Sequence, residues 1–476
     1  MRKWNYGKIK NINLLFLNFP FGIMCHMENL IQPRILKGFR DFLPESEITR
    51  SSLIEKITKV YRSYGFVPID TPVLEYTDIL LRKSNGETEK QVFRFEDNGG
   101  RDVAMRFDLT VPFARFTAEH FSELYMPFKR YHIAKVWRGE KPQAGRYREF
   151  VQCDIDTVGS DSATCDFEIL SVLKAALDEI VGKSENGKKK FVIKVNHRGL
   201  INLFFKNKGL EDKIDEILPV LDAIKKVPEE VTRTKLNELF AACGVGEDAI
   251  SKTYEFIGSS ADASFLDLID RNEKLAGEGA SVYCDRLREI YKMMQVSGIE
   301  SSFEFDPLIM RGLDYYTGIV FETTLYDDNG DEVKIGSVCS GGRYDNLTGL
   351  YMKEKVSGVG GSIGLDRLIA GLEMLGKLEK KGSYLDVEIF NQNGDDVVAY
   401  HKVAAELRAL GISVEVFPEP KKMNQQYKVT EAKAVKWGVL MNKEDIEKGC
   451  FTLKNLQTRE QFVGVNAAKA ADVIRK

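Results

Sequence analysis

The spacing of apolar residues predicts a helix followed by an edge strand near the start of the chain. Over residues 46–64 apolar side chains recur at the interval of an amphipathic helix. Residues 66–74 then have the composition of an extended segment that contains Pro68 and Pro72. Proline cannot donate a hydrogen bond at a central strand position, so we expect this segment at a sheet edge or at an interface.

A long hairpin is predicted in the next part of the chain. Two strand-like runs, 128–137 and 148–158, flank a polar loop, which indicates antiparallel sheet. The pattern then predicts a helix at 166–181. The Gly-, Ser- and Lys-rich segment 183–190 has the composition of a linker.

The second half of the chain changes pattern twice. Residues from about 199 to 298 are dominated by helical periodicity, which predicts an all-helical insertion. Strand character returns at Phe303, and a glycine-dense tract leads into a helix near Leu365. After a second linker at 377–383, strands and helices alternate as βαβαβ, so we expect a small α/β domain with a parallel sheet.

The first 27 residues have a different composition and leave three interpretations open. They carry four basic residues and no acidic one, and an apolar stretch at 14–24 is interrupted by Asn18, Pro20 and Gly22. That stretch is too short and broken to span a bilayer of about 30 Å. The segment fits a secretory signal in outline, an organellar import leader, or translated sequence upstream of a true start at Met24 or Met27.

Composition and charge narrow the function classes. The 476 residues suggest about three structural units. Sixty-eight basic residues against 71 acidic ones give a net charge of -3, so a nucleic-acid partner would need a local basic patch. Seven scattered cysteines without a CxxC pair argue against a disulfide framework and a thiolate metal site, and favour a reducing compartment.

Several common motifs are missing from the sequence. It has no GxxxxGK[ST] loop, and GVGGSIG fails as a dinucleotide fingerprint because Ile363 occupies the third glycine position. The five histidines show no metal-ligand spacing, so we expect structural or surface roles for them. These residues are His26, His120, His132, His197 and His401.

The second strand of the hairpin carries the strongest chemical signal. Residues Arg148, Phe150, Gln152, Asp154 and Asp156 recur at period two and therefore share one face. Polar groups repeated on a strand face cost free energy unless they are paired, so they should line a solvated cavity or bind a polar ligand. An exposed sheet face with ion pairs would give the same pattern.

Three more segments combine glycine with chemically active residues. They are RGLDYYTG at 311–318, CSGGRYDNL at 339–347 and GVGGSIGLDRL at 358–368. Alone, each has a structural alternative: a turn before packed aromatics, a bulged hairpin and close strand packing, respectively.

In order along the chain, these segments resemble the signature motifs of class II aminoacyl-tRNA synthetases, with two that mark the histidyl family. KRYHIAKVWRGEKPQAGRYREF is similar to motif 2 and GVGGSIGLDRL to motif 3, while the first helix and Pro72 are similar to motif 1. The resemblance implies an α+β catalytic domain on an antiparallel sheet at 33–376, with the helical insertion at about 199–298. A small α/β anticodon-binding domain at 384–476 would follow, and residues 1–32 would form an extension.

The resemblance also implies an activity and its partners. Such an enzyme activates L-histidine with ATP and Mg²⁺ and then transfers it to the 3′ end of its tRNA. We expect a homodimer formed through motif 1, no membrane association and a cytoplasmic location, with organellar import through residues 1–27 as the alternative.

By motif position, the resemblance assigns roles to individual residues. Arg311 and Arg138 would be catalytic. Histidine-binding roles fall on Asp108, Leu109, Thr110, Arg138, Gln152, Asp156, Arg311, Tyr315, Tyr316 and Tyr344. ATP-binding roles fall on Arg138, Glu140 and Arg367, and contacts with the acceptor end of tRNA on Gln143 and Arg146. No side-chain metal ligand is implied.

Non-catalytic relatives are the competing interpretation. Synthetase-like chains also serve as the regulatory subunit of ATP phosphoribosyltransferase, as a tRNA-sensing module attached to a kinase, or as RNA-binding proteins. The first typically lacks the C-terminal domain, and the second would need a kinase domain. This chain has the C-terminal domain and keeps Arg138, Arg311 and Arg367.

Overall fold

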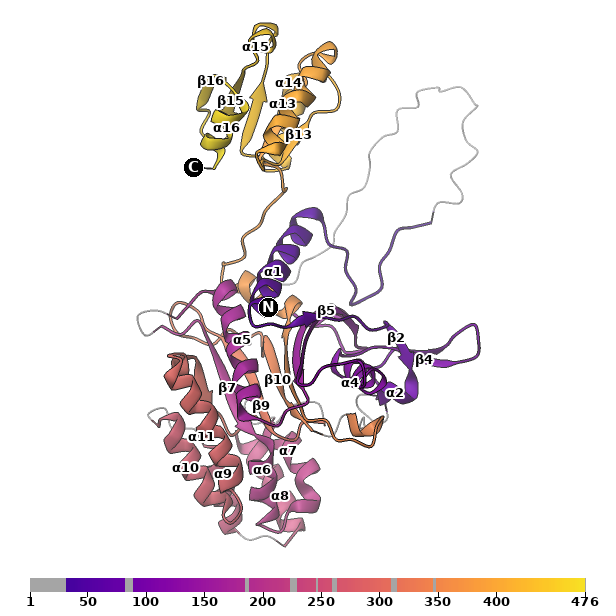
Figure 1. Ribbon diagram of the computed structural model, residues 1–476. Helices are drawn as coiled ribbons and strands as arrows, with labels where there is room; N and C mark the ends of the chain where they lie inside the picture. Colours follow the sequence, from indigo (N-terminus) through magenta and orange to yellow (C-terminus); the bar gives the residue numbers. More distant parts are fainter. Residues whose placement is uncertain are drawn as a thin grey trace, which may run out of the picture. The chain divides into compact units, whose positions relative to one another are not determined.

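The computed structural model describes residues 31–81, 89–184, 188–222, 229–244, 247–258, 263–309, 315–345 and 348–475. The chain divides into two units, Met1–Lys37 and Gly38–Lys476. In the first unit, the described residues 31–36 have no helix or strand. The second unit contains the elements described below (Figure 1).

The largest sheet has eight strands in the order β1-β5-β6-β11-β10-β9-β7-β8. Neighbours from β5 to β7 run antiparallel, while the outermost pairs, β1 with β5 and β7 with β8, are parallel. The predicted antiparallel sheet is therefore confirmed. The strands are β1 (Val67–Pro68), β5 (Phe128–Trp137), β6 (Glu149–Val158), β7 (Phe191–His197), β8 (Phe303–Phe305), β9 (Ile319–Leu325), β10 (Cys339–Tyr344) and β11 (Gly358–Gly364).

The predicted hairpin and edge strand are both present. β5 and β6 pair along their whole length, from Phe128 opposite Val158 to Trp137 opposite Glu149. β1 contains Pro68 and lies at the edge of the sheet, as the missing proline donor requires.

Helices cover one face of this sheet, and the polar side chains of β6 lie on the other face. α1 (Pro44–Ser63) and α5 (Ala163–Val181) contact each other, and α5 contacts β11. From β6, Val151, Cys153 and Ile155 pack in the same hydrophobic core as these helices. Because side chains alternate along a strand, Gln152, Asp154 and Asp156 point to the opposite face.

A smaller sheet, which the sequence pattern did not predict, and three short helices lie in the same unit as the large sheet. The smaller sheet has the order β2-β4-β3. Its strands and the helices are β2 (Leu74–Tyr76), β3 (Arg94–Glu96), β4 (Asp102–Met105), α2 (Thr77–Leu81), α4 (Thr110–Glu119) and α12 (Leu365–Met374).

The helical insertion is present between β7 and β8. Within the described residues of 199–298 the regular elements are helices (Figure 1). They are α6 (Arg198–Lys206), α7 (Ile214–Asp222), α8 (Glu229–Ala242), α9 (Glu247–Ile257), α10 (Phe265–Ala276) and α11 (Ser281–Val296).

The C-terminal region is a separate α/β fold with its own core. The predicted βαβαβ order is present, and β13-β12-β14 are parallel. The predicted parallel sheet is therefore confirmed for these three strands, and β15 and β16, for which the sequence made no prediction, extend it as an antiparallel hairpin. The elements are β12 (Val387–Ile389), α13 (Val397–Ala409), β13 (Val414–Val416), α14 (Met423–Ala432), β14 (Trp437–Leu440), α15 (Lys443–Lys448), β15 (Phe451–Asn455), β16 (Gln461–Val465) and α16 (Ala467–Ile474).

Across the described ranges, no helix has the length and apolar composition that crossing a bilayer demands.

Candidate active site

The polar face of β6 lines a cavity of about 250 Å³. Asp154 and Asp156 each expose 2% of their surface, so the alternative of an exposed face with ion pairs is wrong. Buried carboxylates need partners or a ligand. The lining residues are Asp108, Thr110, Arg138, Gln152, Asp154, Asp156, Tyr315, Tyr316, Phe321, Glu322, Ser340, Gly341, Tyr344, Gly360, Gly361 and Ser362.

A fully buried arginine binds one of the carboxylates that line this cavity. Arg130 on β5 lies 2.6 Å from an oxygen of Asp156, its register partner on β6. Its guanidinium also donates to the carbonyl of Leu109 at 3.2 Å. The Tyr344 hydroxyl donates to the other Asp156 oxygen at 2.5 Å. Asp156 is therefore fixed from two sides.

Burial shifts the protonation of the carboxyl groups in the cavity. It raises the pKa of Asp154 to about 7, a shift that Arg130 opposes and the charge of Asp156 reinforces. The pKa of Asp156 rises to about 6 through burial, against the opposing effects of Arg130 and Tyr344. Such perturbed groups in a cavity are typical of functional sites.

Glycine at position 360 is required by this arrangement. Gly360 on β11 is the register partner of Asp156, and a Cβ added there would lie 1.9 Å from the Asp156 carboxylate. On the next strand, a Cβ at Gly341 would lie 2.2 Å from the Gly360 carbonyl oxygen. The glycine tracts thus provide space for an acidic side chain and a neighbouring strand.

Aromatic and acidic side chains face each other at the other wall. The Tyr315 hydroxyl donates to Asp108 at 3.3 Å, and Asp108 also accepts from the backbone N–H of Val111 at the start of α4. The Tyr315 and Tyr316 rings meet edge to face at 4.8 Å. This wall therefore offers an anion beside aromatic surface.

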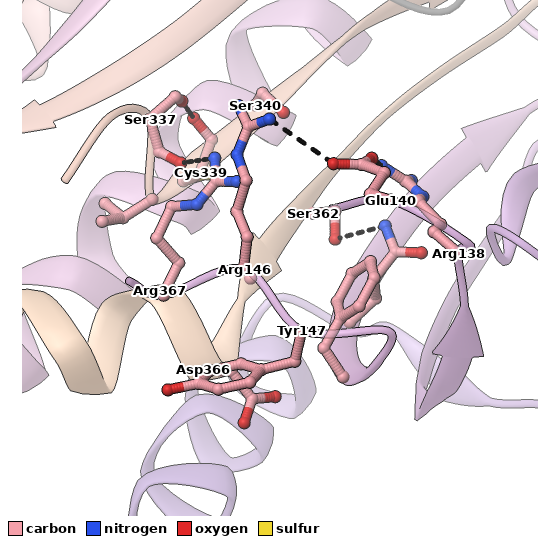
Figure 2. Close-up of a pocket in the computed structure, with 15 residues that line it drawn as sticks. Arg138, Glu140, Arg146, Tyr147, Ser337, Cys339, Ser340, Ser362, Asp366 and Arg367 are labelled. Carbon is pink, nitrogen blue, oxygen red and sulfur yellow. Dashed lines mark hydrogen bonds and ion pairs between the residues drawn. The ribbon is translucent and has the colours of Figure 1, made fainter. Parts of the chain in front are cut away.

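A second cavity has a volume of about 130 Å³, and Figure 2 shows the residues that line it. Four residues line both cavities: Arg138, Gln152, Ser340 and Ser362. Arg138 follows directly after β5, and its Nε donates to the carbonyl of Phe107 at 2.9 Å. Its charge is thereby fixed where the two cavities meet.

Two further arginines and a glutamate line the second cavity. The Arg367 guanidinium, at the start of α12, donates to the Ser337 carbonyl at 2.8 Å, and burial lowers its pKa, reinforced by the charge of Arg146. Glu140 forms an ion pair with Arg146 at 3.4 Å (Figure 2). Three convergent guanidinium groups are suited to a polyphosphate.

The structure brings together most of the predicted site residues. Asp108, Thr110, Gln152, Asp156, Tyr315, Tyr316 and Tyr344 line the first cavity, and Arg138 lines both. Glu140, Arg146 and Arg367 line the second. Leu109 is fully buried and takes part through its carbonyl, while Gln143 is exposed and lines neither cavity. Arg311 lies outside the described residues.

Sequence reasoning missed several lining residues. Asp154 lines the first cavity, as the period-two face of β6 predicted, although the motif resemblance gave it no role. Ser340 and Ser362 become neighbours because β10 and β11 pair in that register, and no local signal marks them.

No group of three or more metal-ligating side chains occurs in the part of the chain that the structure describes. Magnesium is usually bound through one or two carboxylates together with substrate phosphates, so Glu140 and Glu322 beside the arginines fit a metal that arrives with a nucleotide.

Known proteins share both the sequence and the fold. The family model described as "Histidyl-tRNA synthetase" matches residues 38–368, and that described as "Anticodon binding domain" matches 387–476. The histidine–tRNA ligase of Treponema denticola is 54% identical over 422 residues, which cover 88% of this chain and 91% of that protein. That of Rhodopirellula baltica is 45% identical over 436 residues, covering 90% and 95%.

A solved structure agrees with this similarity. The crystal structure of histidyl-tRNA synthetase from Nostoc sp. PCC 7120 has a TM-score of 0.81 at 30% identity, and the match covers 94% of this chain and 99% of that one. The chain uses ATP, histidine and tRNA as substrates in a ligase reaction. It therefore belongs to the histidyl-tRNA synthetase family of class II aminoacyl-tRNA synthetases.

Proposed function

We propose that the cavity over β6 binds histidine, that the adjoining cavity binds ATP, and that Arg138 acts on both substrates. The observation that carries this assignment is the shared wall: Arg138 lines both cavities, at the place where a carboxylate from one side and an α-phosphate from the other would meet. Positioning two reactants in this way can supply much of the rate enhancement.

In the histidine cavity, acidic and aromatic residues bind different parts of histidine. Asp108 and Asp156, with Thr110 and Gln152, receive the α-ammonium group. Tyr315, Tyr316 and Tyr344 face the imidazole ring. A site that hydrogen-bonds both ring nitrogens rejects isosteres, because its own polar groups would otherwise be buried unpaired. Arg130 and the Leu109 carbonyl hold this constellation from below.

In the ATP cavity, Glu140 contacts the adenine side, Arg138 the α-phosphate and Arg367 the γ-phosphate. Arg311 stabilises the charge that develops on the α-phosphate. Glu140 or Glu322 would hold Mg²⁺ together with the substrate phosphates, and the ion would supply positive charge to the remaining phosphate oxygens.

The reaction proceeds in two steps. A histidine carboxylate oxygen attacks the α-phosphorus, an O–P bond forms, and pyrophosphate leaves with the electrons of the broken bond. A ribose hydroxyl at the 3′ end of tRNA then attacks the carbonyl carbon and releases AMP. The first step needs fixed positive charge along its path rather than a proton-transfer residue, and arginines supply that charge.

The tRNA contacts two regions of the chain. The exposed hairpin loop presents Gln143 and Arg146 to the acceptor end. The C-terminal α/β region reads the anticodon. We assign the catalytic domain to 33–376 with the insertion at about 199–298, the anticodon-binding domain to 384–476, and the extension to 1–32.

The chain forms a homodimer through the motif 1 region and works in the cytoplasm. Support for the dimer comes from exposed apolar side chains in and beside β2 and β3: Val73, Leu74, Tyr76 and Phe95 expose 39–51% of their surface. Light scattering on the purified chain tests the dimer, and Tyr76→Arg should produce monomers.

The deciding experiment is exchange between pyrophosphate and ATP with each of the twenty amino acids, with Mg²⁺ and without tRNA. Histidine alone should support exchange. If Asp156→Asn and Tyr316→Ala leave the KM for histidine unchanged in folded protein, the assignment of the histidine cavity is wrong.

A further inference from the structure

Asp166 on α5 lies outside both cavities, is completely buried, and is held between two arginines from different parts of the chain. One of its oxygens accepts from the Nε of Arg343 on β10 at 2.8 Å. The other accepts from the Nε of Arg286, on the insertion helix α11, at 2.7 Å. A carboxylate removed from water in this way depends on both partners.

Arg343 is connected directly to the segment that carries Tyr315 and Tyr316. Its neighbour Tyr344 faces the histidine cavity, so the Arg343 side chain points to the other side of the sheet. The Arg343 carbonyl accepts from the backbone N–H groups of Thr317 at 2.8 Å and Gly318 at 3.3 Å.

The contact between Gly318 and Arg343 leaves no space for a side chain. A Cβ added at Gly318 would lie 2.8 Å from the Cβ of Arg343. The backbone that follows Tyr316 therefore packs directly on the aliphatic part of Arg343, and a shift of Arg343 must displace it.

Asp345 closes a ring of hydrogen bonds around the same segment. It accepts from the Thr317 hydroxyl at 2.6 Å and from the Ser357 hydroxyl at 2.5 Å. The Ser357 hydroxyl in turn accepts from Arg343 at 2.5 Å. Thr317 is thus tied to Arg343 through both its backbone and its side chain.

Both ends of the helical insertion contact this arrangement. At its start, the N–H of Arg198 donates to the Gly318 carbonyl at 2.8 Å. Near its end, Arg286 binds Asp166, and its Nη1 donates to the Asp161 carbonyl at 2.8 Å. The insertion therefore reaches the segment after Tyr316 through the backbone at one end and through the buried Asp166 at the other.

We propose that Arg286, Asp166 and Arg343 are positioning residues for histidine binding, through which the helical insertion holds residues 315–318 against the amino-acid cavity. This inference rests on the proposed placement of histidine beside Tyr315 and Tyr316. None of the three side chains lines either cavity. Their effect is on the position of a wall that contacts histidine and not ATP.

The test compares two arginines on the same helix in the pyrophosphate exchange assay. Arg286→Gln removes the contact with Asp166. Arg288→Gln is the matched control, because Arg288 pairs with Asp270, Glu273 and Asp285 within the insertion. We expect Arg286→Gln to raise the KM for histidine about tenfold while the KM for ATP stays within about twofold, because a displaced wall affects the substrate that it contacts.

Conservative variants separate positioning from folding. Arg286→Lys keeps a positive charge beside Asp166 but cannot keep the planar pair of donors, so its KM for histidine should lie between those of wild type and Arg286→Gln. Asp166→Asn should repeat the effect of Arg286→Gln, and thermal unfolding checks that each variant is folded.

Three results would overturn the inference. The first is an equal rise in both KM values for Arg286→Gln, and the second is the same histidine effect in Arg288→Gln. The third is an unchanged KM for histidine in folded Arg286→Gln and Asp166→Asn.

Tyr316→Ala, measured in parallel, identifies the cause of a negative result. If it raises the KM for histidine and Arg286→Gln does not, the positioning role is wrong while the cavity assignment stands. If Tyr316→Ala also has no effect, the cavity assignment itself fails.

Discussion

Arg50 on α1 donates a hydrogen bond of 2.7 Å to Asp366, 316 residues further along the chain, and both side chains are buried. Arg40 binds the same Asp366 oxygen. The other Asp366 oxygen accepts from the Val151 N–H at 2.9 Å. One carboxylate thus joins α1 to β6 and α12, and the last two elements line the second cavity.

This arrangement predicts a large effect for Asp366→Asn. An amide carries no charge to balance Arg50 and Arg40, and breaking a buried ion pair from one side costs about 3–5 kcal/mol. We expect a loss of that order in the free energy of unfolding, measured with urea, together with a raised KM for ATP because Arg367 is adjacent. Glu444→Gln, which breaks the exposed pair with Lys448, should cost less than about 1 kcal/mol. Equal losses in both variants would contradict this account.

Gly360→Ala should impair histidine binding and also stability, because its Cβ would lie 2.7 Å from the backbone carbonyl oxygen of Ile155 as well as close to Asp156. The new Cβ would lie 1.9 Å from the Asp156 carboxylate, so that side chain must move away from the site. Because displacements of about 1 Å can cost on the order of 10²-fold in rate, we expect kcat/KM for histidine in the exchange assay to fall by about that factor.

Gly349→Ala is the control for this variant, since nothing lies within 4 Å of a Cβ at that position. It should retain wild-type kinetics. Wild-type kcat/KM in Gly360→Ala would show that the carboxylate of Asp156 is not needed in its observed position.

The sequence allowed the main elements and most of the site to be predicted because both have local signals. The helix at α1, the β5–β6 hairpin and the alternating C-terminal elements follow from apolar periodicity and turn residues. The period-two polar face of β6 indicated the cavity. The motif resemblance then supplied the more distant residues of the site, such as Tyr315 and Arg367.

Other features depend on pairing between distant segments. The direction of β15 and β16 is set by a hairpin that adds to β14, and βαβ periodicity does not report it. The binding of Arg50 and Arg343 to Asp366 and Asp166 requires strands and helices to meet across more than a hundred residues. A buried arginine has no sequence pattern of its own.

Asp154→Asn should make stability less dependent on pH. The pKa of Asp154 is raised to about 7 in the folded protein, so between about pH 4 and pH 7 the folded state binds more protons than the unfolded state. The contribution of Asp154 to the free energy of unfolding therefore falls as the pH rises through that range. Asparagine does not titrate, so without ligands the free energy of unfolding of the variant should rise relative to that of wild type up to about pH 7, by about 4 kcal/mol in total.

Asp97→Asn should change the pH dependence of stability in the opposite direction. The pKa of Asp97 is lowered by its hydrogen bond with the side chain of Arg101, so its contribution is present above the ordinary aspartate range and lost in acid. Urea unfolding at pH 5 and pH 8 measures the Asp154 difference. A constant difference between Asp154→Asn and wild type across those pH values would contradict a raised pKa.

Arg311→Ala should cripple activation and leave histidine binding largely intact. Its expected role is to stabilise charge that develops on the α-phosphate only in the transition state, and loss of one such donor costs about 10²–10³-fold in kcat. Calorimetric titration with histidine should give an affinity close to that of wild type. Equal exchange activity in the variant would remove Arg311 from the mechanism.

Arg138→Lys should impair the binding of both substrates at once, which distinguishes Arg138 from the residues that line only one cavity. Its planar guanidinium is fixed by the Phe107 carbonyl at 2.9 Å and lies between the two cavities, so it can donate to a carboxylate and a phosphate together. Lysine keeps the charge but offers a single flexible point of contact. We expect kcat in the exchange assay to fall by about 10²-fold and the KM values for histidine and ATP to rise together.

Arg146→Lys, at the exposed edge of the ATP cavity, should leave the KM for histidine unchanged. A rise in only one KM for Arg138→Lys would mean that Arg138 serves one cavity and that the two reactants do not meet at its side chain.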